Sequence, residues 1–179
     1  MDSFESIVKT ILEYQGFWVQ TSYKVNLRKE EKRNIGRPSS PRWEIDVLAY
    51  NGSKNEVYAI ECKSYLNNPG VRYESFNNGI DSDKFKLFND ANLRRIVFGR
   101  LKKQLVENNS CHKGVKVKLG LATGKIKSKD DRDKLTKLFS KKNWILYTDE
   151  YIKKELLSLT ELSYENEIAV MVAKMLNTS

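Results

Sequence analysis

Two neighbouring runs of aromatic and β-branched residues, Trp43–Tyr50 and Glu56–Ser64, constrain the fold of this chain more than any other feature. Each run has the composition of a buried strand, and the polar stretch NGSKN between them suits a reversal of direction, so together they predict a β-hairpin. Both runs nevertheless contain charged residues, Asp46 in the first and Glu61 and Lys63 in the second. Charged side chains within a sheet require polar partners, which makes these three residues the first candidates for a functional site.

Two registers of this hairpin are compatible with the sequence, and they place Asp46 differently. A tight turn at the Asn-Gly dipeptide of NGSKN would pair Asp46 with Val57, roughly 13 Å along the strand from Glu61. A four-residue loop over residues 52–55 would instead place Asp46 opposite Glu61. Since residues two apart in a strand share a face, Lys63 projects with Glu61 in either case. Only the second register brings all three charged groups together.

This grouping suits the hydrolysis of a phosphodiester bond. Two ionised carboxylates a few ångströms apart repel each other, and a bound Mg²⁺ or Mn²⁺ relieves that repulsion while it polarises a phosphate and acidifies a water molecule. Hard oxygen ligands favour these ions over zinc. The expected ligands are the carboxylates of Asp46 and Glu61 and the backbone carbonyl of Cys62, whose side chain turns into the core. Lys63 would orient the attacking water and offset the charge that develops on the phosphate.

The rest of the chain predicts an α/β fold, with a mixed central sheet flanked by helices. A helix from Asp2 to Gly16 and a strand, Phe17–Leu27, precede an irregular basic loop, Arg28–Arg42. A long loop or partly helical insertion follows the hairpin, and the strands on either side of the helical segment Lys84–Asn108 should be parallel. The later elements are expected at residues 115–121 (strand), 129–142 (helix), 144–148 (strand), 150–159 (helix) and 165–176 (helix), all within a single domain over residues 1–179.

The hairpin motifs resemble those of a known nuclease superfamily. The triplets EID and ECK, with fourteen residues between Asp46 and Glu61, are similar to the signature of the PD-(D/E)XK, or restriction-endonuclease-like, nucleases. The similarity covers about residues 2–121, whose element order resembles the αβββαβ core of that superfamily, and leaves a C-terminal helical extension over about residues 122–179. The N-terminal stretch DSFESIVKTILEYQGFWV resembles its Mrr-like and Holliday-junction-resolvase-like branches. In one departure, Ile45 stands where the signature has Pro.

This resemblance implies Mg²⁺-dependent cleavage of DNA, with Mn²⁺ as a substitute ion. It implies that Asp46 and Glu61 are metal ligands and that Lys63 is the catalytic lysine. It also makes Glu5 a candidate metal ligand, because a Glu of the first helix reaches the metal site in relatives. The alternative for Glu5 is an N-terminal capping box with Asp2, and the sequence leaves both roles open.

Two polar residues fall on the buried side of the Lys84–Asn108 helix. Arg100 and Gln104 lie within the stripe that Leu93, Val97 and Leu101 define, and polar groups at core-facing positions need partners. An active-site phosphate or water would satisfy them, which makes Gln104 a candidate catalytic residue and Arg100 a candidate phosphate ligand. In the alternative, the helix extends beyond the core and water solvates both side chains.

The formal net charge of +9 favours a polyanionic partner, although many basic proteins bind none. A flexible basic arm over Arg28–Arg42 is the first candidate DNA-binding segment, and lysines two apart on the predicted strand at residues 115–121 form a second. Such lysines also guard exposed sheet edges, so their pattern is ambiguous. The candidate nucleic-acid ligands are Arg28, Lys29, Lys32, Arg33, Arg37, Arg42, Arg100, Lys116 and Lys118.

Composition excludes several other classes of protein. His112 is the only histidine, so zinc sites and nucleases built on several histidines are excluded. Cys62 and Cys111 cannot form a disulfide framework, and no apolar run has the length of a membrane span, so we expect a soluble, cytoplasmic protein. The leading interpretation is a DNA endonuclease, acting as a homodimer or in a larger assembly. An RNA-directed nuclease and a nucleic-acid-binding subunit of a restriction, repair or transposition assembly remain alternatives.

Overall fold

A computed structural model describes the whole chain except residues 1, 37, 40–41, 78, 162–166 and 178–179. Its centre is a five-stranded open sheet with the strand order β1-β2-β3-β4-β5. The first three strands are antiparallel neighbours, and β3, β4 and β5 run parallel. The mixed sheet that the sequence predicts is therefore confirmed, as is the parallel pair on either side of the helical segment. The strands are β1 (Trp18–Val25), β2 (Trp43–Asn51), β3 (Glu56–Lys63), β4 (Lys116–Thr123) and β5 (Ile145–Tyr147).

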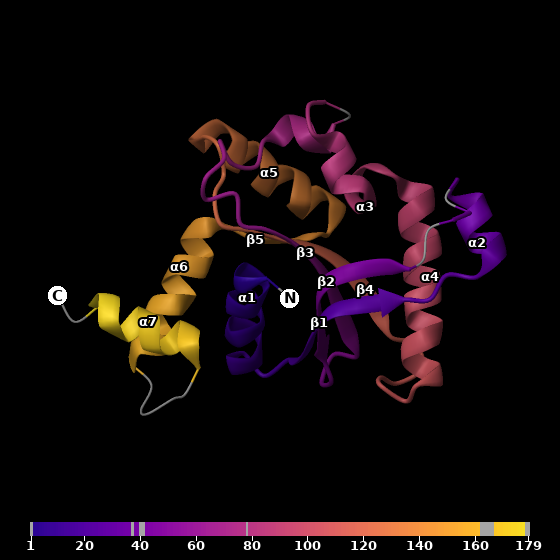
Figure 1. Cartoon of the computed structure of the whole chain (residues 1–179), viewed down its shortest axis with the longest axis horizontal. Coiled ribbons are helices and arrows are strands. Elements are labelled where there is room, and N and C mark those ends of the chain that lie inside the picture. Colours follow the sequence, from indigo (N-terminus) through magenta and orange to yellow (C-terminus); the bar gives the residue numbers. More distant parts are fainter. Residues whose placement is uncertain (1, 37, 40–41, 78, 162–166, 178–179) are drawn as a thin grey trace.

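Seven α-helices in the described residues flank the sheet, which gives an α/β fold (Figure 1). Short 3₁₀ turns lie at Tyr73–Phe76, Ser82–Phe85 and Leu159–Glu161. Among the helices within the described ranges, none combines the length and the apolar character that crossing a lipid bilayer requires. The helices are α1 (Ser3–Tyr14), α2 (Lys29–Asn34), α3 (Lys86–Asn89), α4 (Ala91–Glu107), α5 (Lys129–Lys142), α6 (Asp149–Ser158) and α7 (Ile168–Asn177).

The helices divide between the two faces of the sheet and create two hydrophobic cores. Helices α3, α4 and α5 pack on one face, in a core that we name the α4-side core; its members include Val25, Ile45, Leu48, Leu101 and Phe139. Helices α1, α6 and α7 pack on the other face, in the α1-side core; its members include Val8, Leu12, Val47, Ile60 and Ile152. Figure 1 shows the two groups of helices on either side of the strands.

The side chains of β1 and β2 change faces halfway along these strands. Residues two apart in a regular strand share a face, yet Ile45 belongs to the α4-side core and Val47 to the α1-side core. The change occurs at Asp46. Opposite it on β1, between the pairs Thr21↔Val47 and Tyr23↔Ile45, Ser22 adopts a left-handed backbone conformation with φ of 51°. At this change of faces, the side chain of Asp46 belongs to neither hydrophobic core.

The segment that the sequence predicts as a flexible basic arm contains helix α2, so that prediction is wrong over Lys29–Asn34. A six-residue helix is too short to be stable in isolation. It is held by Glu31, whose carboxylate accepts hydrogen bonds from the backbone N–H of Arg28 at 2.7 Å and from the guanidinium of Arg100 at 2.7 to 3.2 Å. The Asn92 amide also donates to the carbonyl of Asn34. Helix α2 is therefore docked along α4.

This buried ion pair yields a stability prediction. Only 7% of the Arg100 side chain is exposed, so Glu31→Ala leaves a charged guanidinium without its partner in a dry environment. We expect the free energy of unfolding to fall by about 3 kcal/mol. The double variant Glu31→Leu/Arg100→Met, which buries no charge, should recover much of that loss. Urea unfolding of the three proteins checks this, and a double variant no more stable than Glu31→Ala would contradict it.

Candidate functional site

The hairpin adopts the register that brings Asp46 and Glu61 together. The pairs Asn51↔Glu56 and Val47↔Ile60 leave residues 52–55 as the loop, and the same register sets Asp46 against Glu61 at the next position. The backbone pairing between β2 and β3 ends before that position. Asp46 Oδ2 instead accepts a hydrogen bond from the backbone N–H of Cys62 at 2.8 Å, so a side chain replaces the sheet acceptor and the carboxylate is held in place.

The next two charged groups form an ion pair on β3. Lys63 Nζ lies 3.0 Å from Glu61 Oε1, and only 23% and 17% of the two side chains are exposed. The ammonium of Lys63 also lies 6.0 Å from the centroid of the Phe85 ring. These contacts hold the lysine beside the carboxylate, as their spacing in the sequence predicts.

Burial perturbs the protonation of all three groups. Desolvation raises the pKa of Asp46 above its ordinary value, although the Cys62 N–H and the charge of Lys63 oppose it. Desolvation also raises the pKa of Glu61, against the opposing effect of Lys63. For Lys63, burial alone would lower the pKa, but the carboxylates of Glu61 and Asp46 outweigh it and raise the pKa, so the lysine stays charged at neutral pH. Two desolvated carboxylates thus lie beside a charged lysine, an arrangement found both at functional sites and in structural ion-pair networks.

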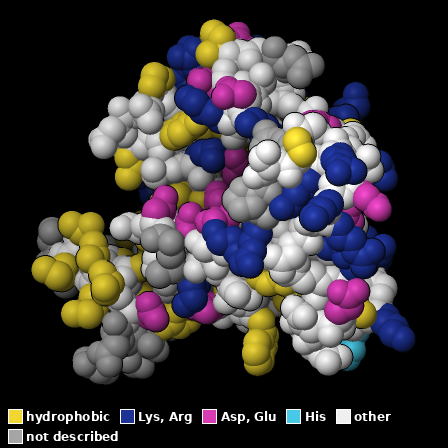
Figure 2. Space-filling view, turned by 45° about the vertical axis from the view of Figure 1, so that its right-hand side comes forward, with side chains coloured by type: hydrophobic (Ala, Val, Ile, Leu, Met, Phe, Trp, Pro, Cys, Tyr) yellow, Lys and Arg dark blue, Asp and Glu magenta, His cyan; other side chains and the backbone are white. Residues whose placement is uncertain are grey.

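Asp46 and Glu61 line a cleft of about 210 Å³. The ends of β2 and β3 form one wall, and Trp43 contributes to it. The opposite wall comes from the segment before α4, with Lys84 and Lys86 among its lining residues. Figure 2 shows acidic side chains gathered in a hollow near the centre of the molecule, with lysine and arginine side chains on its borders. The carboxylates are thus buried in the sheet and open to a space that a small group can enter.

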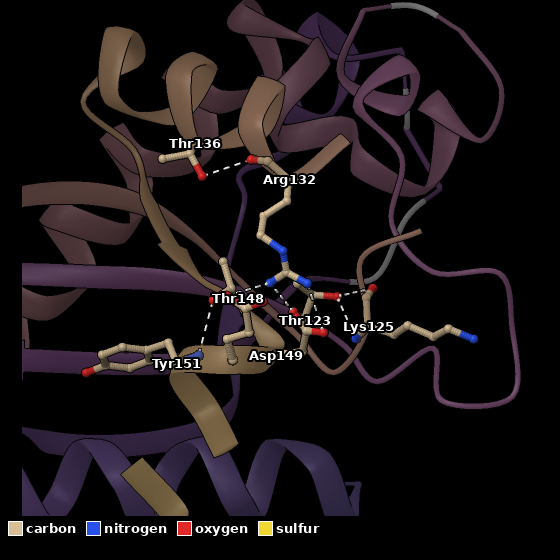
Figure 3. Close-up of polar contacts among 8 residues, drawn as sticks. Thr123, Lys125, Arg132, Thr136, Thr148, Asp149 and Tyr151 are labelled. Carbon is tan, nitrogen blue, oxygen red and sulfur yellow. Dashed lines mark hydrogen bonds and ion pairs between the residues drawn. The ribbon is translucent and has the colours of Figure 1, made fainter. Parts of the chain in front are cut away.

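The loop after β4 supports the end of β3 that carries Lys63. Lys63 pairs with Thr123, and the N–H of Gly124 donates to the carbonyl of Lys63 at 3.0 Å. A Cβ at Gly124 would clash with the carbonyl oxygen of Ser64, so this position requires glycine. The Thr123 hydroxyl donates to the carbonyl of Lys125 at 2.9 Å and closes the turn (Figure 3).

An ion pair next to this turn joins α5 to α6. Figure 3 shows the guanidinium of Arg132 pointing toward Asp149, and its nitrogens lie 2.7 and 3.3 Å from the two carboxylate oxygens. Glu150 adds a second carboxylate at 3.3 Å. The hydroxyl of Thr148 caps α6 by accepting from the N–H of Tyr151. These contacts fix the carboxyl ends of β4 and β5 beside the site.

Glu5 adopts the capping role, one of the two roles that the sequence leaves open. Its carboxylate accepts from the N–H of Asp2 at 3.3 Å, and Asp2 in turn caps α1, which completes a capping box. Its pKa is raised, first by burial and then, among other charges, by the nearby carboxylate of Asp46. Glu5 therefore lies within electrostatic range of Asp46 while it caps the helix.

Gln104 has a structural role, which contradicts the catalytic role expected from the sequence. Its amide nitrogen donates to the hydroxyl of Tyr23 at 3.0 Å and to the carbonyl of Lys24 at 2.9 Å, and its oxygen accepts from the N–H of Asn26 at 2.9 Å. These bonds join α4 to the end of β1. Gln104 is not among the described residues that line the cleft. Gln104 has the polar partners that its position requires, and they come from β1 and the residue that follows it.

The basic candidates differ in burial and in pairing. Arg100 is buried against Glu31, so the structure contradicts its expected role as a phosphate ligand. Lys118 is paired with Glu56 at 3.0 Å, at the end of β4 away from the cleft. Lys32 is half-buried, and Arg37 lies outside the described residues. The exposed candidates are Arg28, Lys29, Arg33, Arg42 and Lys116.

Sequence reasoning missed three residues of the cleft: Trp43, Lys84 and Lys86. Trp43 reads as an ordinary strand aromatic. The sequence places Lys84 and Lys86 at the start of the helical segment Lys84–Asn108, whereas in the structure they lie around a 3₁₀ turn that ends at the buried Phe85. The alternation of lysines about one apolar residue was the available signal, but nothing in the sequence relates that segment to β3.

The donor set fits Mg²⁺ better than a metal that needs a full protein cage. Within the described parts of the chain, no group of three or more His, Cys, Asp or Glu side chains is arranged to hold a metal ion. Asp46 and Glu61 supply two carboxylates, and Cys62 can add only its backbone carbonyl, because its thiol is buried and burial raises its pKa. Mg²⁺ commonly takes one or two carboxylates and completes its shell with water and substrate phosphate.

Comparison with known proteins supports the fold alone. No family model matches the chain, and no curated protein matches it. The chain is similar in structure to AF1548, a protein of unknown function whose crystal structure has been determined, with a TM-score of 0.50 and 20% sequence identity. The alignment covers 96% of this chain and 76% of that one. The likeness concerns the arrangement of the sheet and helices and carries no information on chemistry.

The raised carboxyl pKa values predict a pH dependence of stability. A group whose pKa is higher in the folded state stabilises the fold at low pH, and that contribution is lost as pH rises through the folded-state pKa. The raised pKa of Lys63 adds no change over this range, since it lies above 10.5. Asp46→Asn keeps an acceptor for the Cys62 N–H but removes the charge. Without divalent metal, we expect this variant to be more stable than the wild type at neutral pH and to lose that advantage as the pH falls and the wild-type carboxyl becomes protonated. Thermal melts across this range check it, and a pH-independent difference would contradict it.

Proposed function

We propose that the protein is a Mg²⁺-dependent endonuclease that hydrolyses phosphodiester bonds in DNA. The observation that carries this proposal is the joint position of Asp46 and Glu61 in one cleft, with Lys63 paired to Glu61 and Asp46 fixed by the Cys62 N–H. The resemblance of the EID and ECK triplets to PD-(D/E)XK nucleases points to the same residues. A purely structural ion pair would not need a second, desolvated carboxylate at the same opening.

Each side chain has a defined task in this proposal. Asp46 and Glu61, with the carbonyl of Cys62, would hold the ion, and Glu5 lies close enough to add a further negative charge. When bound, Mg²⁺ offsets the charge of the scissile phosphate and favours deprotonation of the attacking water. Lys63, held charged by Glu61, orients that water and stabilises the negative charge that accumulates on the phosphate oxygens. The buried surroundings strengthen each of these electrostatic effects.

DNA would approach across the basic surface of α2. Arg28, Lys29 and Arg33 are exposed on a helix that is docked against α4, so their positions are fixed relative to the sheet. Trp43, which lines the cleft, begins β2, the strand that follows α2 in the chain. The net charge of +9 favours the same partner. A second copy of the chain, or a larger assembly, would supply the second active centre that cutting both strands of a duplex requires.

The experiment that tests this proposal is a nicking assay on supercoiled plasmid, run beside a structured RNA of matched concentration. We expect nicked plasmid in Mg²⁺ or Mn²⁺, no product in EDTA and an intact RNA. Cleavage of the RNA alone would replace the proposal with an RNA-directed nuclease. Binding to both nucleic acids without cleavage in any divalent metal would make the protein a binding subunit that retains the nuclease fold.

A further inference from the structure

The wall of the cleft that faces the carboxylates carries a lysine with no assigned role. Lys86 is the first residue of α3, and it lines the same cleft as Asp46 and Glu61. It lies close enough to Glu61 for its charge to lower the pKa of that carboxyl, as the last of several effects. The segment that carries it is anchored by Phe85 and Leu87, both buried in the α4-side core, so the position of the α3 wall is fixed.

Lys63, beside the cleft on β3, and Lys86, which lines the cleft, differ in their contacts. Lys63 forms a 3.0 Å ion pair with Glu61 and lies over the Phe85 ring. Its ammonium is therefore already paired with a carboxylate. For Lys86, the described residues provide no ion pair within 4.0 Å, and it is half-buried rather than extended into solvent. A half-buried cation at a cleft, close to but not paired with a carboxylate, is suited to bind an anion that enters between them.

Lys84, which also lines the cleft, is a weaker candidate. About half of its side chain is exposed, and its ammonium lies 2.8 Å from Asp81 Oδ1. A local partner neutralises it at the rim. The observations therefore single out Lys86.

We propose that Lys86 binds a backbone phosphate of the nucleic acid in the cleft and positions the scissile bond against Asp46 and Glu61. This inference rests on the proposed nuclease function and assigns a substrate-binding residue to the same site. The two walls then divide the work. The β2–β3 wall supplies the carboxylates and Lys63 for the attacking water, and the α3 wall supplies the cation that holds the phosphate. Both must be present for the phosphate to lie between them.

The test compares Lys86→Met, Lys86→Arg and Lys154→Met. Methionine keeps the apolar stem of the side chain and removes only the charge, while arginine keeps the charge. Lys154 is an exposed lysine of α6, an element that contributes no described residue to the cleft, and it serves as the charge-matched control. Binding to a labelled DNA duplex is measured with Mg²⁺ across a salt series on a Lys63→Ala background, which removes turnover. Cleavage is measured on the background with Lys63 intact.

We expect Lys86→Met to flatten the slope of log affinity against log salt by about 0.9 and to lower kcat/KM at least about tenfold. Lys86→Arg should retain the slope, and Lys154→Met should match its parent in both assays. Equal losses in Lys86→Met and Lys86→Arg would assign the effect to packing and overturn the inference. If the parent protein cleaves and Lys86→Met is unchanged, the phosphate site is wrong and the nuclease function stands. If nothing cleaves but Lys86→Met still flattens the slope, the nuclease function is wrong and the phosphate site stands.

Discussion

Lys63→Ala is expected to reduce the rate of DNA cleavage by at least about a hundredfold while DNA binding changes little. In the proposed mechanism the ammonium interacts with charge that appears mainly in the transition state, so its loss should lower kcat rather than affinity. Glu61→Gln should have an effect at least as large, because it removes the negative charge of the proposed metal ligand and the ionic partner of Lys63 together. Plasmid nicking under single-turnover conditions gives the rate, and a filter-binding or anisotropy assay gives the affinity.

The matched control for this result is Lys154→Ala, which removes one positive charge from the exposed surface of α6. It should cleave at the wild-type rate. Cleavage by Lys63→Ala at the wild-type rate in Mg²⁺ would show that the assignment of the site is wrong. Loss of binding in step with loss of cleavage would mean that Lys63 contributes ground-state contacts rather than catalysis.

The second large effect concerns affinity. The triple variant Arg28→Ala/Lys29→Ala/Arg33→Ala should weaken DNA binding and flatten its salt dependence by about two to three units, since each phosphate contact on duplex DNA contributes a slope of about −0.9. The metal dependence of cleavage should not change, because none of these three residues is among the described residues that line the cleft. Affinity measured from low to moderate salt, with the slope as the readout, provides the check.

A charge-matched triple variant in Lys9, Lys153 and Lys154 separates a local effect from a change in net charge. These residues lie on α1 and α6, on the opposite face of the sheet from α4. Their replacement should leave the slope close to that of the wild type. An unchanged slope in the α2 variant would refute a DNA contact at α2 and would leave the proposed roles of Asp46, Glu61 and Lys63 unaffected.

The sequence was sufficient to predict the elements whose information is local. The helix over Lys129–Lys142 was predicted with the bounds that the structure has, because Ser128 caps its start and Asn143 ends it in a left-handed conformation. The hairpin and its two candidate registers were also accessible from alternation and turn composition. Choosing between the registers required the structure, because the Asn51-Gly52 dipeptide favours a tight turn whereas the observed loop spans residues 52–55.

The features that the sequence did not reveal depend on distant contacts. Helix α2 exists because Glu31 meets Arg100, 69 residues away, and no periodicity in a six-residue segment signals this. The role of Gln104 depends on the end of β1, about eighty residues earlier. The place of Lys86 in the cleft depends on a 3₁₀ turn whose position the sequence does not specify. A polar residue on a buried helix face indicates that a partner exists, but it does not identify the partner.

The change of faces in β1 and β2 also bears on how the molecule unfolds. Because Ile45 and Val47 are two residues apart in one strand and insert into opposite cores, neither core can open without displacing the strand that the other needs. We therefore expect the two layers to unfold as one cooperative unit. Amide hydrogen exchange should give the same opening free energy for Leu101 and Ile60, one from each core. Asp46 lies at the point where the strand changes faces. Displacing its carboxylate by local unfolding should therefore require global unfolding of the protein.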